Sequence, residues 1–164
     1  MSQSARKSAA GGGFDAIDRQ ILDLLQDRDI PLAALAEAVG LSQTPCWRRV
    51  RKLEEAGVIR GRVTLVDPRQ AGARMVMFIG VSALRHEARW LEDFRALVDE
   101  IPEVVEAYRM TGSTDYILKL LVPDIETYAR IYQHMVERLE FSQINASIAI
   151  EELKYTTAVP TAYL

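Results

Sequence analysis

The residues best suited to chemistry are cationic and lie on one side of a predicted helix that follows Ser42. Successive residues of an α-helix are rotated by about 100°, so the apolar residues of this segment face one way and its cationic residues face the other. The outward side carries Thr44, Arg48, Arg51 and Lys52. Because guanidinium groups bind guanine edges and phosphates, this side is suited to the major groove of DNA.

The two ends of the same segment add further candidate DNA contacts. Ser42, Gln43 and Thr44 lie at the helix N-terminus, where contacts to bases or phosphates are geometrically favourable. Arg60 and Arg62 follow the helix, and we expect them to contact the DNA backbone rather than the bases. These residues complete the candidate DNA-binding set.

Charge is unevenly distributed along the chain, which carries a formal net charge of -3. Residues 42–62 contain six basic residues against two acidic ones, and this local excess could meet phosphates. A solvated helix surface is the alternative interpretation of such a run. Arg49 lies beside the apolar stripe of the helix, so we expect it to pair with Asp18 or Glu54 rather than with DNA.

Apolar residues at helical spacing predict the elements that would position this surface. One helix is expected from Phe14 and a short second helix over residues 31–40. Ser42 or Thr44 can cap the third helix after a sharp turn. Residues 58–65 alternate apolar with polar side chains around a glycine, which predicts a hairpin or wing. Together these elements predict a winged helix-turn-helix.

The remainder of the chain predicts a second domain. After a break at Asp67-Pro68, the expected order is βαββαβ, in which two helices cover one face of a four-stranded sheet. The expected elements are strands 74–84, 104–111, 116–122 and 143–154 and helices 87–100 and 125–139. The predicted fold class is α+β, with an N-terminal winged helix-turn-helix joined to a C-terminal ferredoxin-like βαββαβ domain. The expected parts are a flexible tail (1–13), a DNA-binding domain (14–65), a linker (66–73) and the C-terminal domain (74–164).

The first predicted strand of the second domain is apolar on both faces. Met75, Met77 and Ile79 lie on one side, whereas Val76 and Phe78 lie on the other. Two helices can cover only one face of the sheet, so we expect a second subunit to cover the other face. A two-fold homodimer is the simplest arrangement.

Composition disfavours several classes of protein. The longest apolar run, residues 75–84, is shorter than the roughly 20 residues that cross a bilayer, so no membrane span is expected. The first residues lack the apolar core of a signal peptide, which predicts a cytoplasmic protein. Cys46 is the single cysteine, and His86 and His134 lack metal-ligand spacing. We therefore expect no disulfide within the chain, no metal site and no cofactor.

Five motifs occur in a definite order along the chain. They are FDAIDRQIL, LAEAVGLSQTPCWRRVRKLEEAGVIRG, the Asp67-Pro68 linker, TGSTDY and EELKYTTAVP. Together they resemble the leucine-responsive regulatory protein/AsnC family, also called feast/famine regulators, over nearly the whole chain beyond residue 13. The resemblance implies a transcriptional regulator with an N-terminal DNA-binding domain and a C-terminal domain for effector binding and oligomerisation. The implied partners are double-stranded DNA, an amino acid or similar metabolite, and further copies in a homodimer, tetramer or octamer.

The same resemblance implies a site for the effector. In that family the turn between the second and third strands of the C-terminal domain helps to bind the ligand at contacts between dimers. Carried over by position, the implied residues are Arg109, Thr111, Gly112, Ser113, Thr114, Asp115 and Tyr116. Gly112 would let backbone N–H groups approach a carboxylate, and Asp115 could pair with an α-ammonium group. An ordinary hairpin turn, in which Asp115 bonds the backbone, is the alternative.

Two other functions fit the predicted architecture. The sirohaem decarboxylases share this two-domain arrangement, and such an enzyme would need polar catalytic groups in a cleft between the domains. A metabolite sensor that acts only through protein contacts would show no salt-dependent affinity for DNA. The complete recognition-helix pattern and the basic wing favour a DNA-binding regulator over an enzyme.

Overall fold

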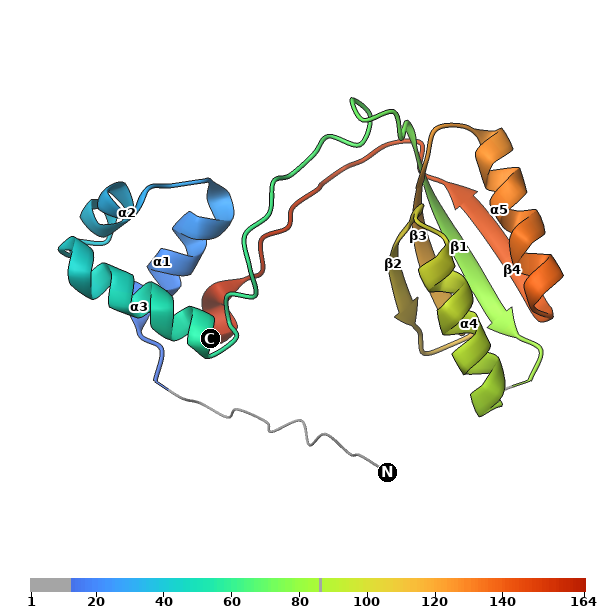
Figure 1. The fold of residues 1–164 in the computed structure, drawn as a ribbon, viewed down its shortest axis with the longest axis horizontal. Helices are drawn as coiled ribbons and strands as arrows, with labels where there is room; N and C mark the ends of the chain where they lie inside the picture. The colour runs from blue at the N-terminus through green and yellow to red at the C-terminus, as the bar shows by residue number, and fades with distance from the viewer. Residues whose placement is uncertain (1–12, 86) are drawn as a thin grey trace. The chain divides into compact units, whose positions relative to one another are not determined.

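The computed structural model describes residues 13–85 and 87–164, which form two compact units (Figure 1). The first unit contains residues 13–63 together with Lys154–Leu164, and the second contains the described residues of Thr64–Leu153. The flexible tail expected over residues 1–13 falls, except for its last residue, outside the described residues. No helix in the described ranges is long and apolar enough to span a membrane.

Three helices build the first unit: α1 (Ala16–Asp27), α2 (Leu32–Ala38) and α3 (Gln43–Glu55). A capping box starts α1, because the Asp15 carboxylate accepts the backbone N–H of Asp18 while the Asp18 carboxylate accepts that of Asp15. All three helices predicted from apolar spacing are present.

The turn between α2 and α3 sets the recognition helix across the helix before it. Gly40 takes the left-handed conformation at φ +69°, and the Leu41 N–H then donates to the Ala36 carbonyl at 2.9 Å. The helix α3 begins at Gln43, so Ser42 rather than Thr44 occupies the N-cap position.

The apolar faces of the three helices meet in one core. Ile21 of α1, Leu35 of α2 and Leu53 of α3 are essentially inaccessible, and Cys46 and Val50 lie with them. Full burial of one such aliphatic side chain contributes about 1.5 to 3 kcal/mol. Burial also raises the pKa of the Cys46 thiol, as expected for a small buried hydrophobe rather than a reactive thiol.

The hairpin expected over residues 58–65 is not formed. These residues contain no paired strand, although Val58 and Ile59 both donate backbone hydrogen bonds to Leu53 at the end of α3. A two-residue hairpin turn needs positive φ angles, and Gly61 is not among the described glycines that have one. The wing is therefore a single segment without a partner strand.

The second unit has the predicted βαββαβ order. Its elements are β1 (Met75–Ala83), α4 (Ala88–Glu100), β2 (Val104–Arg109), β3 (Tyr116–Val122), α5 (Ile125–Arg138) and β4 (Phe141–Ile148). The strands form one sheet in the order β2-β3-β1-β4, and every neighbouring pair is antiparallel. This is the arrangement of a split βαβ, ferredoxin-like domain.

The two helices cover one face of this sheet. Phe94 and Leu97 of α4 and Met135 of α5 pack on Ile79 and Leu118 in the core of the unit. The opposite face is only partly covered, since Phe78 of β1 remains 39% exposed. Within the second unit, the described residues therefore leave part of this apolar face exposed.

The last strand is shorter than the 143–154 expected. Ile148 pairs with Met77, and one further bond runs from the Ala149 N–H to the Val76 carbonyl near the start of β1. The chain then leaves the sheet and continues into Lys154–Leu164, which belongs to the first unit and contains the short 3-10 helix η1 (Thr161–Tyr163). This grouping differs from the single C-terminal domain of residues 74–164 expected from sequence.

Candidate nucleic-acid interface and ligand site

The outward side of α3 is accessible, as its spacing predicted. The side chains of Thr44, Arg48, Arg51 and Lys52 are all exposed, whereas Cys46, on the opposite side, is fully buried. In the described part of the chain, no carboxylate forms an ion pair with Arg48. The guanidinium of Arg48 is therefore available to an external acceptor.

Arg51 and Lys52 are accessible but already have partners within the unit. Arg51 lies 3.4 Å from a carboxylate oxygen of Glu54 and 3.3 Å from one of Glu55. Both ion pairs are weak because they are exposed to solvent. Lys52 donates to the Gly13 carbonyl at 2.6 Å and lies 4.8 Å from the centre of the Phe14 ring. Lys52 thus turns toward the start of α1, which its spacing alone did not indicate.

Arg49 connects α3 to the capping box of α1. Its Nη1 lies 2.7 Å from Oδ1 of Asp18 and 2.8 Å from Oδ2 of Asp15. The backbone N–H of Asp18 and then the Arg49 guanidinium hold the pKa of Asp15 below its ordinary value. The same pairing, first with Asp18, raises the pKa of Arg49. The predicted pairing of Arg49 with Asp18 is confirmed.

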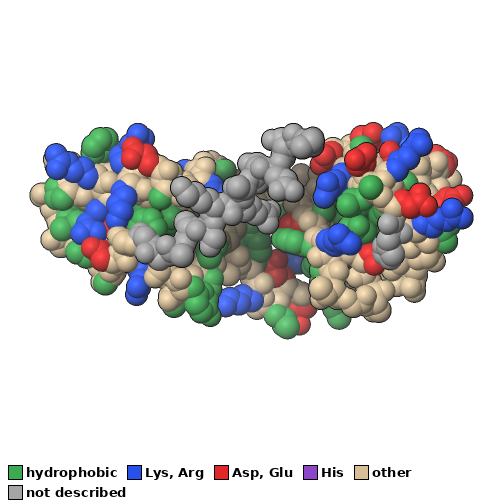
Figure 2. Space-filling model, turned by 90° about the horizontal axis from the view of Figure 1, so that it is seen from below, with side chains coloured by type: hydrophobic (Ala, Val, Ile, Leu, Met, Phe, Trp, Pro, Cys, Tyr) green, Lys and Arg blue, Asp and Glu red, His purple; other side chains and the backbone are tan. Residues whose placement is uncertain are grey.

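The N-terminal end of α3 and the segment after it complete the predicted surface. Ser42, Gln43 and Thr44 are exposed, and the Ser42 hydroxyl makes no capping bond. Arg60 and Arg62 are exposed in the segment that follows α3. Figure 2 shows Lys and Arg side chains gathered over the first unit, with few acidic side chains among them on this face.

The turn between β2 and β3 carries most of the residues implied for the effector. Thr111, Gly112 and Ser113 are exposed, and Arg109 ends β2 with an exposed side chain. Gly112 has φ +115°, which favours glycine. The Met110 N–H donates to the Asp115 carbonyl at 2.8 Å and closes the turn.

Asp115 fixes this turn to the neighbouring strand β1. Its Oδ2 accepts the Ala83 backbone N–H at 2.9 Å, and its own N–H donates to the Val81 carbonyl at 3.1 Å. This backbone role is close to the ordinary-turn alternative, with bonds to the adjacent strand. Thr114 packs near Gly80, where an added Cβ would lie 3.2 Å from the Thr114 Cγ2.

Tyr116 is separated from the exposed part of the turn. Its side chain is buried between α4 and the sheet, with ring centres 4.8 Å from Phe94 and 5.8 Å from Trp90. The structure thus brings residues 109 and 111–115 together at one end of the sheet and places the Tyr116 ring in the core. Alternation along β3 could have predicted this burial, because Tyr116 lies on the same side of the strand as the buried Leu118.

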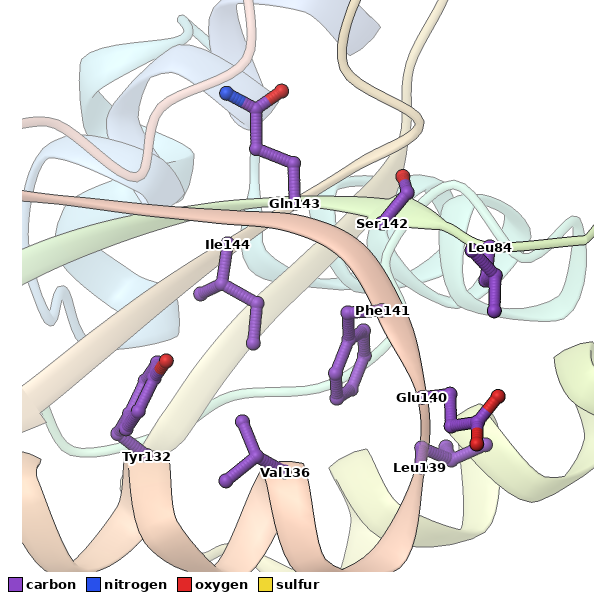
Figure 3. Close-up of a pocket in the computed structure, with 9 residues that line it drawn as sticks. All are labelled: Leu84, Tyr132, Val136, Leu139, Glu140, Phe141, Ser142, Gln143 and Ile144. Carbon is purple, nitrogen blue, oxygen red and sulfur yellow. The ribbon is translucent and has the colours of Figure 1, made fainter.

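A separate hollow of about 550 Å³ lies between α5 and the edge strand β4 (Figure 3). Tyr132 and Val136 of α5 face Phe141 and Ile144 of β4 across it, while Gln143 points away to the other side of the strand. None of the residues implied for the effector lines this hollow. The i, i+4 spacing of Tyr132 and Val136 is the sequence signal for it.

Metal-binding geometry is not found in the described ranges, where no three His, Cys, Asp or Glu side chains cluster suitably. His134 lies 3.6 Å from a carboxylate oxygen of Glu100, and His86 lies outside the described residues.

The two units match two family models. The winged helix-turn-helix DNA-binding model matches residues 14–60, and the Lrp/AsnC ligand binding domain model matches residues 76–159. The chain belongs to the Lrp/AsnC family. Both halves of the predicted resemblance are thereby confirmed.

Similar proteins support the same assignment over about nine tenths of the chain. A glutamate uptake regulatory protein of Zymomonas mobilis is 44% identical over 148 residues, which are 90% of each chain. The crystal structure of an AsnC family transcriptional regulator from Agrobacterium tumefaciens matches with a TM-score of 0.88 and 44% identity, covering 92% of this chain and 99% of that one. A transcriptional regulator from Neisseria meningitidis, solved in complex with L-methionine, has the same TM-score and coverages at 31% identity.

These findings establish the α+β architecture and the class of function. This Lrp/AsnC protein is a transcriptional regulator with a winged helix-turn-helix DNA-binding domain and a ligand-binding domain. The relatives are regulators rather than enzymes.

Proposed function

We propose that this Lrp/AsnC regulator reads a specific DNA sequence through α3 and that an amino acid or related metabolite alters its DNA affinity or assembly. The observation that carries the proposal is the guanidinium of Arg48, which is exposed on the outward side of a helix whose other side is buried and which pairs with no described carboxylate. Such a cation can form two hydrogen bonds to guanine or bind a phosphate.

Several neighbouring side chains add to this interface. Arg51 can exchange its exposed partners Glu54 and Glu55 for phosphate, since exposed ion pairs are weak. Ser42, Gln43 and Thr44 lie where the N-terminal end of a recognition helix meets bases, and Arg60 and Arg62 extend the cationic surface toward the backbone. Lys52 contributes to the local positive potential while bonding Gly13.

The turn at residues 109–115 is the proposed effector site. Its exposed backbone at Gly112 suits the carboxylate of an amino acid, and Arg109 offers a second anion-binding group nearby in sequence. Asp115 contributes negative charge that favours an α-ammonium group. The L-methionine complex of the Neisseria relative supports the class of ligand and leaves its identity open.

Assembly is part of the same proposal. We infer a homodimer in which the open sheet face of one subunit covers that of the other, with association to tetramers or octamers. Phe78 and Val76 supply apolar surface, and the Lys119–Glu106 pair at 2.8 Å, with Tyr108 donating to Glu106, lies on the same face. Paired recognition helices in a dimer would favour pseudo-palindromic DNA. The cytoplasm, expected from the sequence, is the proposed location of this regulator.

Selection of bound fragments from random double-stranded DNA, with and without a panel of free amino acids, tests the proposal. We expect enrichment of a two-fold-related sequence, an affinity that falls with salt, and a change on adding one class of amino acid. The mass in solution is recorded in parallel.

Two outcomes would contradict the proposal. Enrichment of no DNA at any salt concentration, with amino acids still bound, would indicate a sensor that acts through protein contacts. Absence of DNA binding together with tetrapyrrole binding would indicate an enzyme with the same architecture.

A further inference from the structure

The C-terminal segment Lys154–Leu164 is bonded to α1 of the first unit, to which the chain returns (Figure 1). The Val159 N–H donates to Oε1 of Gln26 at 2.7 Å, and Nε2 of Gln26 donates to the Val159 carbonyl at 3.1 Å. Thr161 donates its hydroxyl to Oδ1 of Asp23 at 2.8 Å. One carboxamide therefore satisfies both backbone groups of Val159, as a neighbouring strand would.

The contacts of this segment are sufficient to dock it and too few to make the docking permanent. Together with α1 and residues 58–63, the segment lines a mainly apolar hollow of about 790 Å³ that includes Leu22, Leu25 and Pro160. Val159 nevertheless remains 69% exposed and Tyr163 92% exposed. A segment with little buried apolar surface and solvent-accessible hydrogen bonds opens at low cost.

The docked segment gives the first unit a second covalent connection to the second unit. The chain leaves the first unit after Val63 and returns to it at Lys154. The strand β4 ends at Ile148 and Val159 is bonded to α1, so residues 149–158 form the connection between them on the return side. Ten extended residues span at most about 36 Å. Movement of β4 away from α1 beyond that reach must release the segment.

The surface of α1 that holds the segment is linked to the recognition helix. Leu22 and Leu25 belong to the same apolar core as Val50 and Leu53 of α3. Arg49 of α3 also bonds Asp18 of α1. A change in the packing of α1 therefore acts on the element that carries Arg48.

We propose that Lys154–Leu164 is a latch, held on α1 by Gln26 and Asp23, through which the second unit controls DNA binding by the first. The latch has two states, docked and released, and its equilibrium depends on both units. Such a two-state element is the physical requirement for coupling between distant sites. Released, the chain leaves one linker between the units, which lets them reorient independently. The coupling rests on the proposed function, whereas the docking does not.

Hydrogen exchange on the full-length protein, read by mass spectrometry, tests the docking. The variant Gln26→Ala removes both bonds to Val159, and Gln20→Ala makes the same change at an exposed position of the same helix. We expect peptides covering residues 155–164 to exchange at least about tenfold faster in Gln26→Ala and at the unaltered rate in Gln20→Ala. Equal exchange in all three proteins would overturn the latch.

DNA binding in the presence of effector tests the coupling. The probes are the DNA fragments selected above and a mixture of the twenty protein amino acids. The quantity compared is the ratio of the Kd for DNA with amino acids to the Kd without them. In the unaltered protein and in Gln20→Ala, we expect this ratio to differ from one. In Gln26→Ala, we expect it to move at least about fivefold toward one. The salt dependence of basal DNA binding should be the same in all three proteins. If hydrogen exchange shows the segment released in Gln26→Ala and the Kd ratio still equals that of the unaltered protein, the coupling is overturned.

A second variant separates release of the latch from damage to α1. Thr161→Val removes the hydroxyl that bonds Asp23 and leaves the helix intact, so it should accelerate exchange of the segment and weaken the coupling in the same direction. If the unaltered protein binds no DNA, the proposed function and the coupling both fail, and the exchange data still decide whether the segment docks.

Discussion

The Arg49 guanidinium of α3 contacts the fully buried carboxylate of Asp18 in α1, with 2.7 Å between Nη1 and Oδ1. Its neighbour Arg48 is exposed and makes no ion pair with any described carboxylate. Two adjacent arginines therefore have different tasks. Arg49 holds the recognition helix on α1, and Arg48 remains available for DNA.

Replacing Arg49 should destabilise the first unit. Arg49→Ala leaves the buried Asp18 carboxylate with Lys52 as its remaining cationic partner, at 3.7 Å. We expect a loss of about 2 to 3 kcal/mol in the free energy of unfolding, less than for a fully buried pair because Arg49 is partly exposed. Urea unfolding followed by Trp47 fluorescence, in a Trp90→Phe background, measures it. Arg48→Ala is the matched control, and an equal, small effect of both variants would contradict the assignment.

Replacing Arg48 should weaken DNA binding without unfolding the protein. Arg48→Ala is expected to cost about 1 to 3 kcal/mol for the selected sequence if the guanidinium reads a base. If it contacts phosphate instead, the loss should be uniform across sequences and the salt dependence should decrease by about one unit. Fluorescence anisotropy with selected and scrambled duplexes separates the two.

The control for Arg48 is Arg95→Ala, which removes an exposed arginine from α4 of the second unit. It changes net charge by the same amount, so long-range electrostatics are matched. Equal affinities of the two variants would exclude Arg48 from the interface.

Periodicity predicted the three helices of the first unit. It also predicted the direction of α3, because burial of Cys46, Val50 and Leu53 fixes which side faces outward. The same argument identified Arg49 as a pairing residue. Periodicity did not predict the position of Lys52, since a flexible side chain at the edge of the outward side can reach back to Gly13. That contact depends on where α1 begins in space, which spacing along α3 does not specify.

The remaining differences involve contacts distant in sequence. The wing alternates like a strand, but alternation specifies no partner, and residues 58–65 have none in the described chain. The strand β4 ends at Ile148, opposite Met77, although Val76 and Met75 of β1 extend beyond that pair, so the sequence of β4 alone does not set its end. The return of Val159 to Gln26 spans 133 positions and leaves no local pattern.

Acid should destabilise the first unit through Asp15. Its folded pKa is lowered, first by the Asp18 backbone N–H and then by Arg49, from an ordinary value of 3.8. A carboxyl group with a depressed folded pKa contributes stability that is present above its unfolded pKa and is lost as the pH falls through the folded pKa. We therefore expect the contribution of Asp15 to disappear below about pH 4.

Asp15→Asn is the matched variant, since its side-chain oxygen can still accept the backbone bonds and no longer titrates. Its melting temperature should fall less than that of the unaltered protein between about pH 5 and about pH 3. If the melting temperatures of the two proteins fall by the same amount over this pH range, Asp15 makes no pH-dependent contribution to stability.

Two substitutions at Asp115 separate its bond to β1 from its charge. Asp115→Ala removes the acceptor for the Ala83 N–H and should cost about 1 to 3 kcal/mol of stability by leaving that group unpaired. Asp115→Asn keeps an oxygen acceptor and removes the charge, so stability should change by less than about 1 kcal/mol. If the carboxylate pairs with an α-ammonium group, Asp115→Asn should still weaken amino-acid binding about tenfold in calorimetric titration. Unaltered binding by a stable Asp115→Asn would leave Asp115 with the backbone role alone.

The close approach of Gly80 to Thr114 provides a test of how β1 positions the effector turn. In Gly80→Ala the new methyl group would lie 3.2 Å from the Thr114 Cγ2, and Thr114 has little freedom because the adjacent Asp115 is bonded to β1. We expect about 1 kcal/mol of destabilisation and weaker amino-acid binding as the turn is displaced. Thr114→Ser removes Cγ2, so the double variant should recover most of both losses, and a double-mutant cycle measures the recovery. Additive effects would mean that the two side chains do not compete for this space and that the turn is positioned by Asp115 alone.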